Sequence, residues 1–528
     1  MIKEMNWQLN PKLAVLLIIL LSAFACVSLR RFFIRRQFAR RHGCQPVARS
    51  VTKDPFLGLD KLPGAILALR QHKVLEKDCL NFRTYGNTFT LKELQSRAVV
   101  TIEPENIKTI LSLNFNDYSI AHRLEPFKPL LGEGIFDTDG EHWAFSRALI
   151  RPTFTRDQVA DLTTFEELIQ DLFLLLPGDG KTVVDLQDLF FRYTIDSATK
   201  FLFGQSVGTL KKSESDLGFA NAFHYAQEAI ITRGLLGPLN IFYRDRKADE
   251  CNRICREFAQ EFVEEAFHSV EARKKEDDEK QTETKGRKHI FSHELAWRTS
   301  DKRRILDELM NVLLAGRDTT ASLLSNLFFV LAKNPAIWDK LRREVAVLEG
   351  RPPKYDELRS LKYIQCCINE CERECYLLPL GPALLTSLAL RLHPVVPRNN
   401  RQAVRDTVLP VGGGKDGLSP VFVPKGTLVC YMVYAMHRRT DIYGPDTEVF
   451  RPERWEDGKL MPRWGYLPFN GGPRICIGQR YSLTEVGYTL VRMAQEFRVL
   501  ESRDPGPWEE SLTLTLCSRN GTKVCLAH

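Results

Sequence analysis

The sequence has little excess charge of either sign, and its cysteines form no paired framework. Its 528 residues carry 74 Lys and Arg against 66 Asp and Glu, a net charge of +8. Much of this excess lies beside an apolar N-terminal segment, so we expect no nucleic-acid partner. The 13 cysteines are odd in number and irregularly spaced, which argues against a disulfide scaffold and for a reducing compartment.

A nucleotide-binding fingerprint is missing as well, although Gly412, Gly414 and Gly417 spell G-x-G-x-x-G. A dinucleotide site needs a helix directly after that turn, because the helix N-terminus holds the pyrophosphate. Here Pro420 and Pro424 follow within a β-like stretch, which predicts a surface turn. We therefore expect no flavin or nicotinamide site in this chain.

The segment from Leu13 to Leu29 is an uncharged apolar run that we predict to be a single transmembrane anchor. As a helix it spans roughly 26 Å, against ~30 Å for a bilayer core. Six arginines follow it: Arg30, Arg31, Arg35, Arg36, Arg40 and Arg41. Positive charge on that side holds it in the cytoplasm. The alternative, a cleaved secretory signal, would carry basic residues before the run and a small-residue cleavage site after it.

The anchor divides the chain into four predicted parts. Residues 1–12 form a short luminal N-terminus, 13–29 the anchor, 30–66 a basic and Pro-containing linker, and 67–528 one mainly helical domain with small β-sheets. Helical patterning covers 165–176, 219–231 and 305–331, and strand-like patterning covers 421–423 and 427–431. The polar stretch Arg273–His289 alternates acids and bases, which predicts a solvated loop between helices.

The ten residues from Phe469 to Gly478, FNGGPRICIG, carry the strongest chemical pattern. A thiolate that donates electrons to iron must be shielded from water and must receive hydrogen bonds. Glycines let backbone N–H groups approach the sulfur of Cys476 closely. Phe469 can shield that sulfur, and Arg474 can pair with a haem propionate. The helix expected after Gly478 points its N-terminus at the anionic sulfur, which the helix dipole favours.

This loop resembles the haem-binding signature of the cytochrome P-450 family. The resemblance implies the cytochrome P-450 fold and a haem b whose iron takes Cys476 as its axial thiolate. It also implies that Phe469, Arg474 and Gly478 belong to the cofactor site. The alternative is a buried structural cysteine in a Gly-rich turn.

A second matching segment lies inside the predicted helix 305–331. Gly316 leaves room for O2 there, and the Thr319 hydroxyl can hydrogen-bond the bound oxygen. Asp318 can relay protons from solvent, as the acid–alcohol pair does in the cytochrome P-450 family. Taken alone, Asp-Thr-Thr in a helix is more typical of a surface face; the match to the rest of the family pattern favours the functional interpretation.

Four further residues match the family's cofactor and ion-pair residues. Trp143 and Arg147 are four residues apart, so they share one helix face, and both can donate to a propionate. Arg401 matches a further propionate contact. Arg454, in the segment Phe450–Trp455, matches the arginine that joins a structural triad with a Glu and an Arg of another helix.

The helix that should supply this Glu and Arg departs from the family pattern. Glu370 and Arg373 spell E-x-x-R, but Arg391 has the expected distance to the HPVVP run. Residues 371–388 therefore look like an insert, and its two prolines and one glycine cannot continue a helix. We interpret 371–388 as a retained intron translated in frame; a tolerated loop is the alternative.

Taken together, the resemblance implies a monooxygenase that inserts one oxygen atom of O2 into a C–H bond of a hydrophobic substrate. Several strings, among them KDPFLGLD and HRRTDIYGPD, resemble the fungal branch that oxidises alkanes and fatty acids. This implies terminal hydroxylation of a long-chain fatty acid, alkane or lipid-like metabolite. Electrons would come from NADPH–cytochrome P-450 reductase on the same endoplasmic reticulum membrane, with the catalytic domain cytoplasmic.

Two other functions stay open. A haem-thiolate isomerase or dehydratase would not activate O2, although the pair Asp318 and Thr319 argues against it. The chain would instead be an inactive haem-binding isoform if the insert 371–388 disables it.

Overall fold

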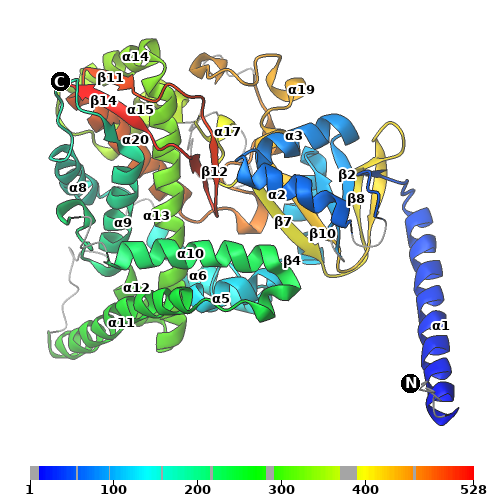
Figure 1. Cartoon of the computed structure of the whole chain (residues 1–528). Coiled ribbons are helices and arrows are strands. Elements are labelled where there is room, and N and C mark those ends of the chain that lie inside the picture. The colour runs from blue at the N-terminus through cyan, green and yellow to red at the C-terminus, as the bar shows by residue number, and fades with distance from the viewer. Residues whose placement is uncertain are drawn as a thin grey trace, which may run out of the picture.

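The structure is a computed structural model that describes residues 11–54, 58–93, 96–155, 159–213, 218–280, 290–368, 389–455 and 460–528. Helices fill one side of the body, a mixed sheet lies on the other, and α1 stands apart (Figure 1). The helices are α1 Pro11–Arg41, α2 Leu62–Arg70, α3 Val74–Tyr85, α4 Pro104–Lys108, α5 Leu124–Leu131, α6 Gly140–Ile150, α8 Thr163–Phe173, α9 Leu186–Phe203, α10 Gly218–Leu236, α11 Arg246–Lys280, α12 Phe291–Arg298, α13 Lys302–Ala332, α14 Pro335–Val345, α15 Tyr355–Ser360, α16 Lys362–Ile368, α17 Ala389–Leu392, α18 Val433–Met436, α19 Thr440–Tyr443 and α20 Gln479–Glu496. The predicted class, mainly helical with small sheets, is confirmed.

The largest sheet joins strands from both ends of the chain, in the order β1-β2-β3-β10-β7-β4. Its strands are β1 Ala48–Arg49, β2 Thr88–Glu93, β3 Ser96–Thr101, β10 Leu428–Met432, β7 Arg398–Ala403 and β4 Tyr118–Ser119. The smaller sheets contain β11 Val499–Ser502, β14 Lys523–Ala527 and β5 Val184–Asp185; β12 Glu510–Leu512 and β13 Leu516–Ser518; and β8 Thr407–Gly413 and β9 Ser419–Val423. β10 pairs with β3 in parallel and with β7 antiparallel.

The helix α13 runs through the middle of the helical side (Figure 1). Nearly all of its residues from Ile305 onward are buried, including polar and charged ones such as Glu308 and Asn311. Asp301 caps it, because the carboxylate accepts the Arg304 N–H at 3.0 Å. A Cβ atom at Gly316 would lie 3.4 Å from the Ala198 Cβ, so glycine here lets α9 pass close to α13.

Most of the predicted elements are confirmed. The segments 165–176, 219–231 and 305–331 form most of α8, α10 and α13, and 421–423 and 427–431 fall on β9 and β10. The G-x-G-x-x-G segment closes the β8–β9 hairpin, where Gly414 has a φ of +79° and Gly417 a φ of +72°. This is the surface turn that the prolines predicted.

Two boundaries differ from the predictions. The polar stretch 273–289 begins as helix, because α11 continues to Lys280; residues 281–289 lie outside the described part. The residues after the anchor are also more structured than a linker. Arginine is a good helix former, so α1 continues to Arg41, and Ala48–Arg49 then pairs with β2.

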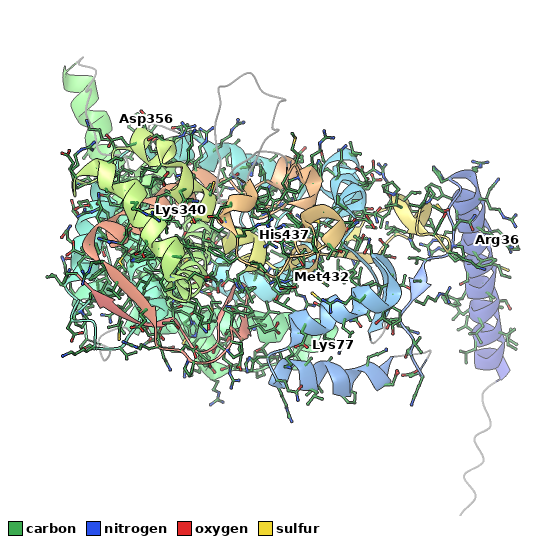
Figure 2. All side chains as sticks on the ribbon, turned by 90° about the horizontal axis from the view of Figure 1, so that it is seen from above. Arg36, Lys77, Lys340, Asp356, Met432 and His437 are labelled. Atoms are coloured by element: carbon green, nitrogen blue, oxygen red, sulfur yellow. The ribbon has the colours of Figure 1, made fainter. Side chains whose placement is uncertain are left out.

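The C-terminal end of α1 is attached to the body at the β8–β9 hairpin. The Arg35 Nε donates to Asp406 at 3.2 Å, and the rings of Phe38 and Phe422 are 5.7 Å apart. Arg36 lies on α1, away from the body, while His437 and Met432 lie inside it (Figure 2). Among the described residues, Val15–Arg41 is the one helix long and apolar enough to cross a membrane.

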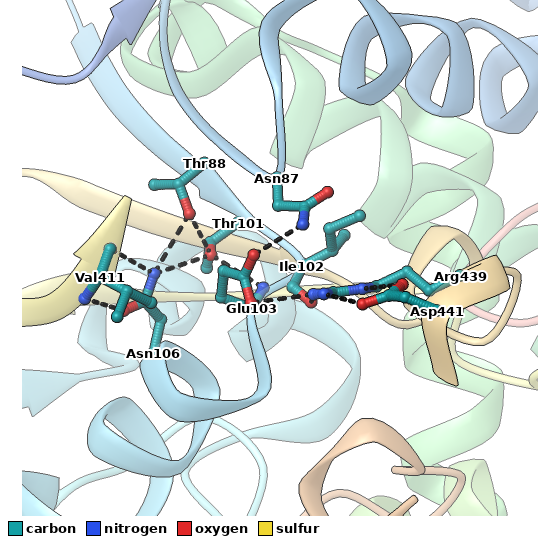
Figure 3. A network of polar contacts seen from close by, with 9 residues as sticks. All are labelled: Asn87, Thr88, Thr101, Ile102, Glu103, Asn106, Val411, Arg439 and Asp441. Atoms are coloured by element: carbon teal, nitrogen blue, oxygen red, sulfur yellow. Dashed lines mark hydrogen bonds and ion pairs between the residues drawn. The ribbon is translucent and has the colours of Figure 1, made fainter. Parts of the chain in front are cut away.

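A buried amide fastens α4 to the sheet (Figure 3). The Asn106 Nδ2 donates to Thr101 Oγ1 at 3.0 Å and to the Val411 carbonyl at 2.9 Å, and its Oδ1 accepts the Val411 N–H. On the other side, Arg439 donates to Glu103 at 2.9 Å. These contacts fix the position of the turn 109–113 that follows α4.

Candidate functional site

The loop that contains Cys476 packs so closely that two of its residues must be glycine. Gly472 has a φ of +67°, and a Cβ atom there would lie 1.9 Å from the Leu111 carbonyl oxygen. A Cβ atom at Gly471 would lie 2.6 Å from the Trp464 ring. No side chain fits at either distance, so the glycines let the loop approach the turn 109–113.

The sulfur of Cys476 is enclosed by protein but open on one side. The Cys476 N–H donates to the Phe469 carbonyl at 3.0 Å, which folds the loop back on itself. Burial raises the pKa of the Cys476 thiol, whereas the backbone of Gly478, the Arg147 cation and the backbone of Gln479 lower it. The side chain nevertheless keeps exposed surface. The start of α20 beside the sulfur favours a thiolate.

One face of α13 borders an internal space. Between residues 305 and 332 of α13, the three residues that keep partial exposure are Ala315, Gly316 and Thr319. They are spaced i, i+1 and i+4, so they lie on one helix face. The Thr319 hydroxyl donates to the Ala315 carbonyl at 2.6 Å.

Two contacts link this part of α13 to the Cys476 loop. The hydroxyls of Thr320 and Ser482 are 3.1 Å apart, and Ser482 lies in the first turn of α20. Ile477 packs against the hydrophobic cluster that contains Met310 and Leu313 of α13. The structure thus brings the two sequence motifs together although more than a hundred residues separate them.

Asp318 is buried and lies beside its neighbour Arg317. The Arg317 Nη1 donates to the Asp318 Oδ1 at 2.8 Å, and both side chains are almost fully buried. Burial raises the pKa of the Asp318 carboxyl, whereas Arg317 and, more weakly, His224 lower it. A buried carboxyl with opposing influences on its pKa is suited to binding and releasing a proton.

Arg474 lies against the ring of Trp143. The guanidinium is 4.4 Å from that ring, and its Nη2 donates to Asp139 at 2.6 Å and to the Thr138 carbonyl at 2.7 Å. The guanidinium of Arg147 lies 6.0 Å from the centre of the same Trp143 ring. Trp143, Arg147 and Arg474, which we predicted to hold propionates, are therefore neighbours.

Arg401 joins this group together with two residues that we did not predict. The Arg401 Nη1 donates to Asn399 Oδ1 at 3.1 Å, and the His122 ring lies 2.8 Å from Asn400 Oδ1. Burial, followed by Arg401, lowers the pKa of Arg123 to about 10. His122 and Arg123 belong to no spaced motif, so only their burial beside Arg401 identifies them.

The cation cluster, which we define as the guanidiniums of Arg123, Arg401 and Arg474 with the neutral ring of His122, whose pKa burial lowers to about 4, fits an anionic cofactor. Arg401 and Arg474 both lower the pKa of Arg123, so the guanidiniums repel one another. Asp139 is the carboxylate that contacts Arg474, and one carboxylate does not balance three guanidiniums. The buried Nδ1 of His122 also has no hydrogen-bond partner among the described residues. Two propionates would satisfy these donors, so the residues fit a haem.

Arg391 and Arg454 both donate hydrogen bonds to the backbone of one loop, residues 443–449. The Arg391 Nη1 donates to the Thr447 carbonyl at 2.6 Å, and the Arg454 Nη1 donates to the Tyr443 carbonyl at 2.6 Å. Burial lowers the pKa of His437 to about 3, so its neutral ring accepts the Leu467 N–H just before the Cys476 loop. The other predicted triad residues, Glu370 and Arg373, and the insert 371–388 lie outside the described residues.

Comparison with known proteins identifies the family. The sequence model of the Cytochrome P450 family matches residues 61–385 and 389–526. The cytochrome P450 monooxygenase himC of Aspergillus japonicus is 48% identical over 94% of this chain and 86% of its own length. Cytochrome P450 monooxygenase fsdH of Fusarium heterosporum is 44% identical over 97% and 88%, and cytochrome P450 52A3-B of Candida maltosa is 40% identical over 89% of each chain. Because the match spans nearly the whole chain, this protein belongs to the cytochrome P450 family of haem-thiolate oxygenases.

Proposed function

We propose that this protein is a membrane-anchored monooxygenase that hydroxylates the terminal carbon of a long-chain fatty acid, alkane or lipid-like metabolite. The observation that carries the oxygenase part is the face of α13 on which Thr319 keeps exposed surface, next to Thr320, which contacts Ser482 just after the Cys476 loop. The resemblance to the fungal alkane and fatty-acid branch supports the aliphatic substrate.

In this proposal Cys476 is the axial ligand of the haem iron, and Phe469 shields its sulfur. The cation cluster, together with Trp143 and Arg147, holds the propionates. When bound, the haem supplies O2 binding and oxygen transfer to a C–H bond. The backbone at Gly478 and Gln479, at the start of α20, lowers the pKa of the Cys476 thiol against the larger effect of burial, and so favours the anionic sulfur that the iron would bind.

Asp318 and Thr319 are proposed to deliver protons to the site. Thr319 presents its hydroxyl on the face shared with Ala315, and the hydroxyl can exchange the Ala315 carbonyl for a ligand bound on that face. Asp318 binds a proton on its own side of α13 and passes it toward Thr319. An isomerase or dehydratase would need no such pair.

The N-terminal helix α1 is the basis for both the proposed membrane anchor and the proposed electron donor. We propose that α1 crosses the endoplasmic reticulum membrane once and that its arginines hold the catalytic domain on the cytoplasmic side. NADPH–cytochrome P-450 reductase would supply two electrons per turnover from the same membrane.

Full-length protein in membranes with this reductase and NADPH provides the test. A series of fatty acids and alkanes of increasing length should give terminal alcohols in an O2-dependent reaction. Hydroxylation elsewhere on the chain would contradict the regiochemistry alone. Turnover of fatty-acid hydroperoxides without reductase, with no O2-dependent product, would contradict the monooxygenase function and favour an isomerase or dehydratase.

A further inference from the structure

A cavity with both polar and apolar walls lies on the side of α13 that Asp318 faces. Its volume is about 250 Å³, and its walls come from the start of α9, one face of α10 and the β12–β13 hairpin. A water molecule needs roughly 10–15 Å³ of such space, so the cavity has room for several. Its hydroxyl groups, from Ser511, Thr513 and Thr515, can hydrogen-bond such water.

The inner end of the cavity is the buried carboxyl of Asp318. Arg317 holds this carboxyl at 2.8 Å, and the guanidinium of Arg317 is itself 5.0 Å from the ring of Phe191, which lines the cavity. The side-chain amide of Gln227, also in the cavity wall, lies close enough to Asp318 to lower the pKa of its carboxyl.

The outer end of the cavity carries groups that exchange protons with solvent. His224 and Glu228 are one helical turn apart on α10, with 3.6 Å between His224 Nε2 and Glu228 Oε1. Their side chains are 59% and 54% exposed, and that of Asp188 is 62% exposed. Titratable side chains therefore stand at the mouth and at the inner end, and three hydroxyl side chains also belong to the wall.

We propose that this cavity carries protons from solvent to Asp318, with His224 and Glu228 as relay residues at its mouth. The proposal rests on the role of Asp318 given under the proposed function. Insertion of one oxygen atom of O2 into a C–H bond uses two electrons from the reductase and two protons, and it yields an alcohol and water. Each proton leaves solvent at His224 or Glu228, crosses the cavity through water and binds the Asp318 carboxylate.

The groups that face Asp318 determine whether a substitution at His224 raises or lowers the pKa of the Asp318 carboxyl. They are Arg317 of α13, His224 and Glu228 of α10, Asp188 of α9, Asp185 of β5 and Cys517 of β13. Burial raises the pKa of Asp318, whereas Arg317 and then His224 lower it. Replacing His224 with an uncharged residue must raise this pKa, so Asp318 keeps its proton to higher pH.

The test uses full-length holoprotein in membranes with reductase and NADPH. The variants are His224→Gln with Glu228→Gln, and Thr513→Trp, which places a bulky ring in the cavity. His268→Gln and Glu501→Trp, on surfaces away from the cavity, are the matched controls. We expect the cavity variants to form product about fivefold more slowly, less than the ~10²-fold that a full proton-transfer group contributes. Their solvent isotope effect should rise, and more of the O2 consumed should leave as hydrogen peroxide.

A second readout does not depend on turnover. The infrared carboxyl band of Asp318 in the resting protein, assigned by its loss in Asp318→Asn, should titrate at higher pH in His224→Gln. Cavity variants that match the controls in isotope effect, peroxide and infrared titration would overturn the proposal, provided Asp318→Asn still slows turnover. If Asp318→Asn itself has no effect, the proton-delivery part of the proposed function fails instead.

Discussion

At the scale of single residues, two arginines that contact the same carboxylate differ in burial. The Arg454 Nη1 lies 2.6 Å from Asp446 Oδ1, and the Arg451 Nη1 lies 2.9 Å from Asp446 Oδ2. The Arg454 side chain is 3% exposed and that of Arg451 is 50% exposed. Arg454 also donates to two backbone carbonyls of the loop 443–449. It therefore stabilises the backbone of the loop as well as the Asp446 carboxylate.

We expect Arg454→Ala to lower the free energy of unfolding by about 3–5 kcal/mol, because it breaks a buried ion pair and frees buried carbonyls. The matched change Arg451→Ala should cost less than about 1 kcal/mol, since that pair is exposed. Chemical denaturation of the holoprotein, followed by haem absorbance, measures both. Equal losses in the two variants would show that burial of Arg454 is not what stabilises the loop.

Glu485 of α20 predicts how stability depends on pH. Burial raises the pKa of its carboxyl from the usual 4.5 to about 8, against weaker lowering by Ser197 and Thr320. Between these values the folded protein holds a proton that the unfolded chain releases, so folding stability falls by about 1.4 kcal/mol per pH unit as pH rises. Above about 8 this contribution is constant.

Glu485→Gln removes this titration because an amide binds no proton in that range. The stability difference between the variant and the parent protein should therefore grow from pH 5 to pH 8 in favour of the variant, and then level off. Thermal unfolding of both proteins at several pH values measures the difference. A pH-independent difference would contradict a protonated Glu485 in the folded state.

The residues of the site divide into those that the sequence could predict and those that it could not. Cys476, Phe469 and Gly478 were predictable because ten consecutive residues carry the whole pattern. His122 and Arg123 were not, since the contact with Arg401 joins residues that lie far apart in the chain. The cavity at Asp318 is likewise made by α9, α10 and a C-terminal hairpin, whose meeting no local pattern shows.

At the scale of elements, the short helices α16 and α17 flank residues 369–388, which lie outside the described part of the chain. Deleting residues 371–388 would join Glu370 to Ala389 and place Glu370 and Arg391 three apart, on one helix face. We expect the deletion to raise haem content and to stabilise the protein by about 3 kcal/mol, because it restores a buried ion-pair element.

The retained-intron hypothesis has its own measurement. Reads from the mature transcript should lack the codons for residues 371–388. If the transcript retains them and the full-length protein binds haem as well as the deletion variant does, 371–388 is a tolerated loop.

The attachment of α1 to the body predicts where the chain can be shortened. Removing residues 1–41 should release the protein from integral membrane association and leave the fold intact. Removing residues 1–50 also deletes β1 and the backbone bonds from Gln45 to Pro420 and from Gly414 to Pro46. This second truncation should cost about 2–4 kcal/mol, at roughly 1 kcal/mol for each lost hydrogen bond. Membrane extraction and thermal unfolding of the two proteins distinguish these outcomes.

The elements show why some boundaries were not predictable. The helix α13 was predictable because its apolar residues continue without a helix breaker. Two-residue strands such as β1 and β4 have no period of their own, since they exist only through pairing with β2 and β7. The polar end of α11 was wrongly assigned to a loop because Lys, Glu and Arg are solvated and also good helix formers.

At the scale of the whole molecule, the family match and the fold agree on a single catalytic body. The helix α13 and the glycine-rich loop with Cys476 meet through Thr320 and Ser482, and Arg474 of that loop belongs to the cation cluster. The helix α1 is fixed to the body near the β8–β9 hairpin through Arg35 and Phe38.

The binding of haem iron by the Cys476 thiolate is tested most directly by the carbon monoxide difference spectrum of the reduced protein. The parent protein should show the red-shifted absorption band of thiolate-ligated haem, and Cys476→Ser should lose it. Cys430→Ser, a matched change in the half-buried β10, should keep the band. A Cys476→Ser protein with the same haem content and an unchanged band would contradict the assignment of Cys476 as the iron ligand.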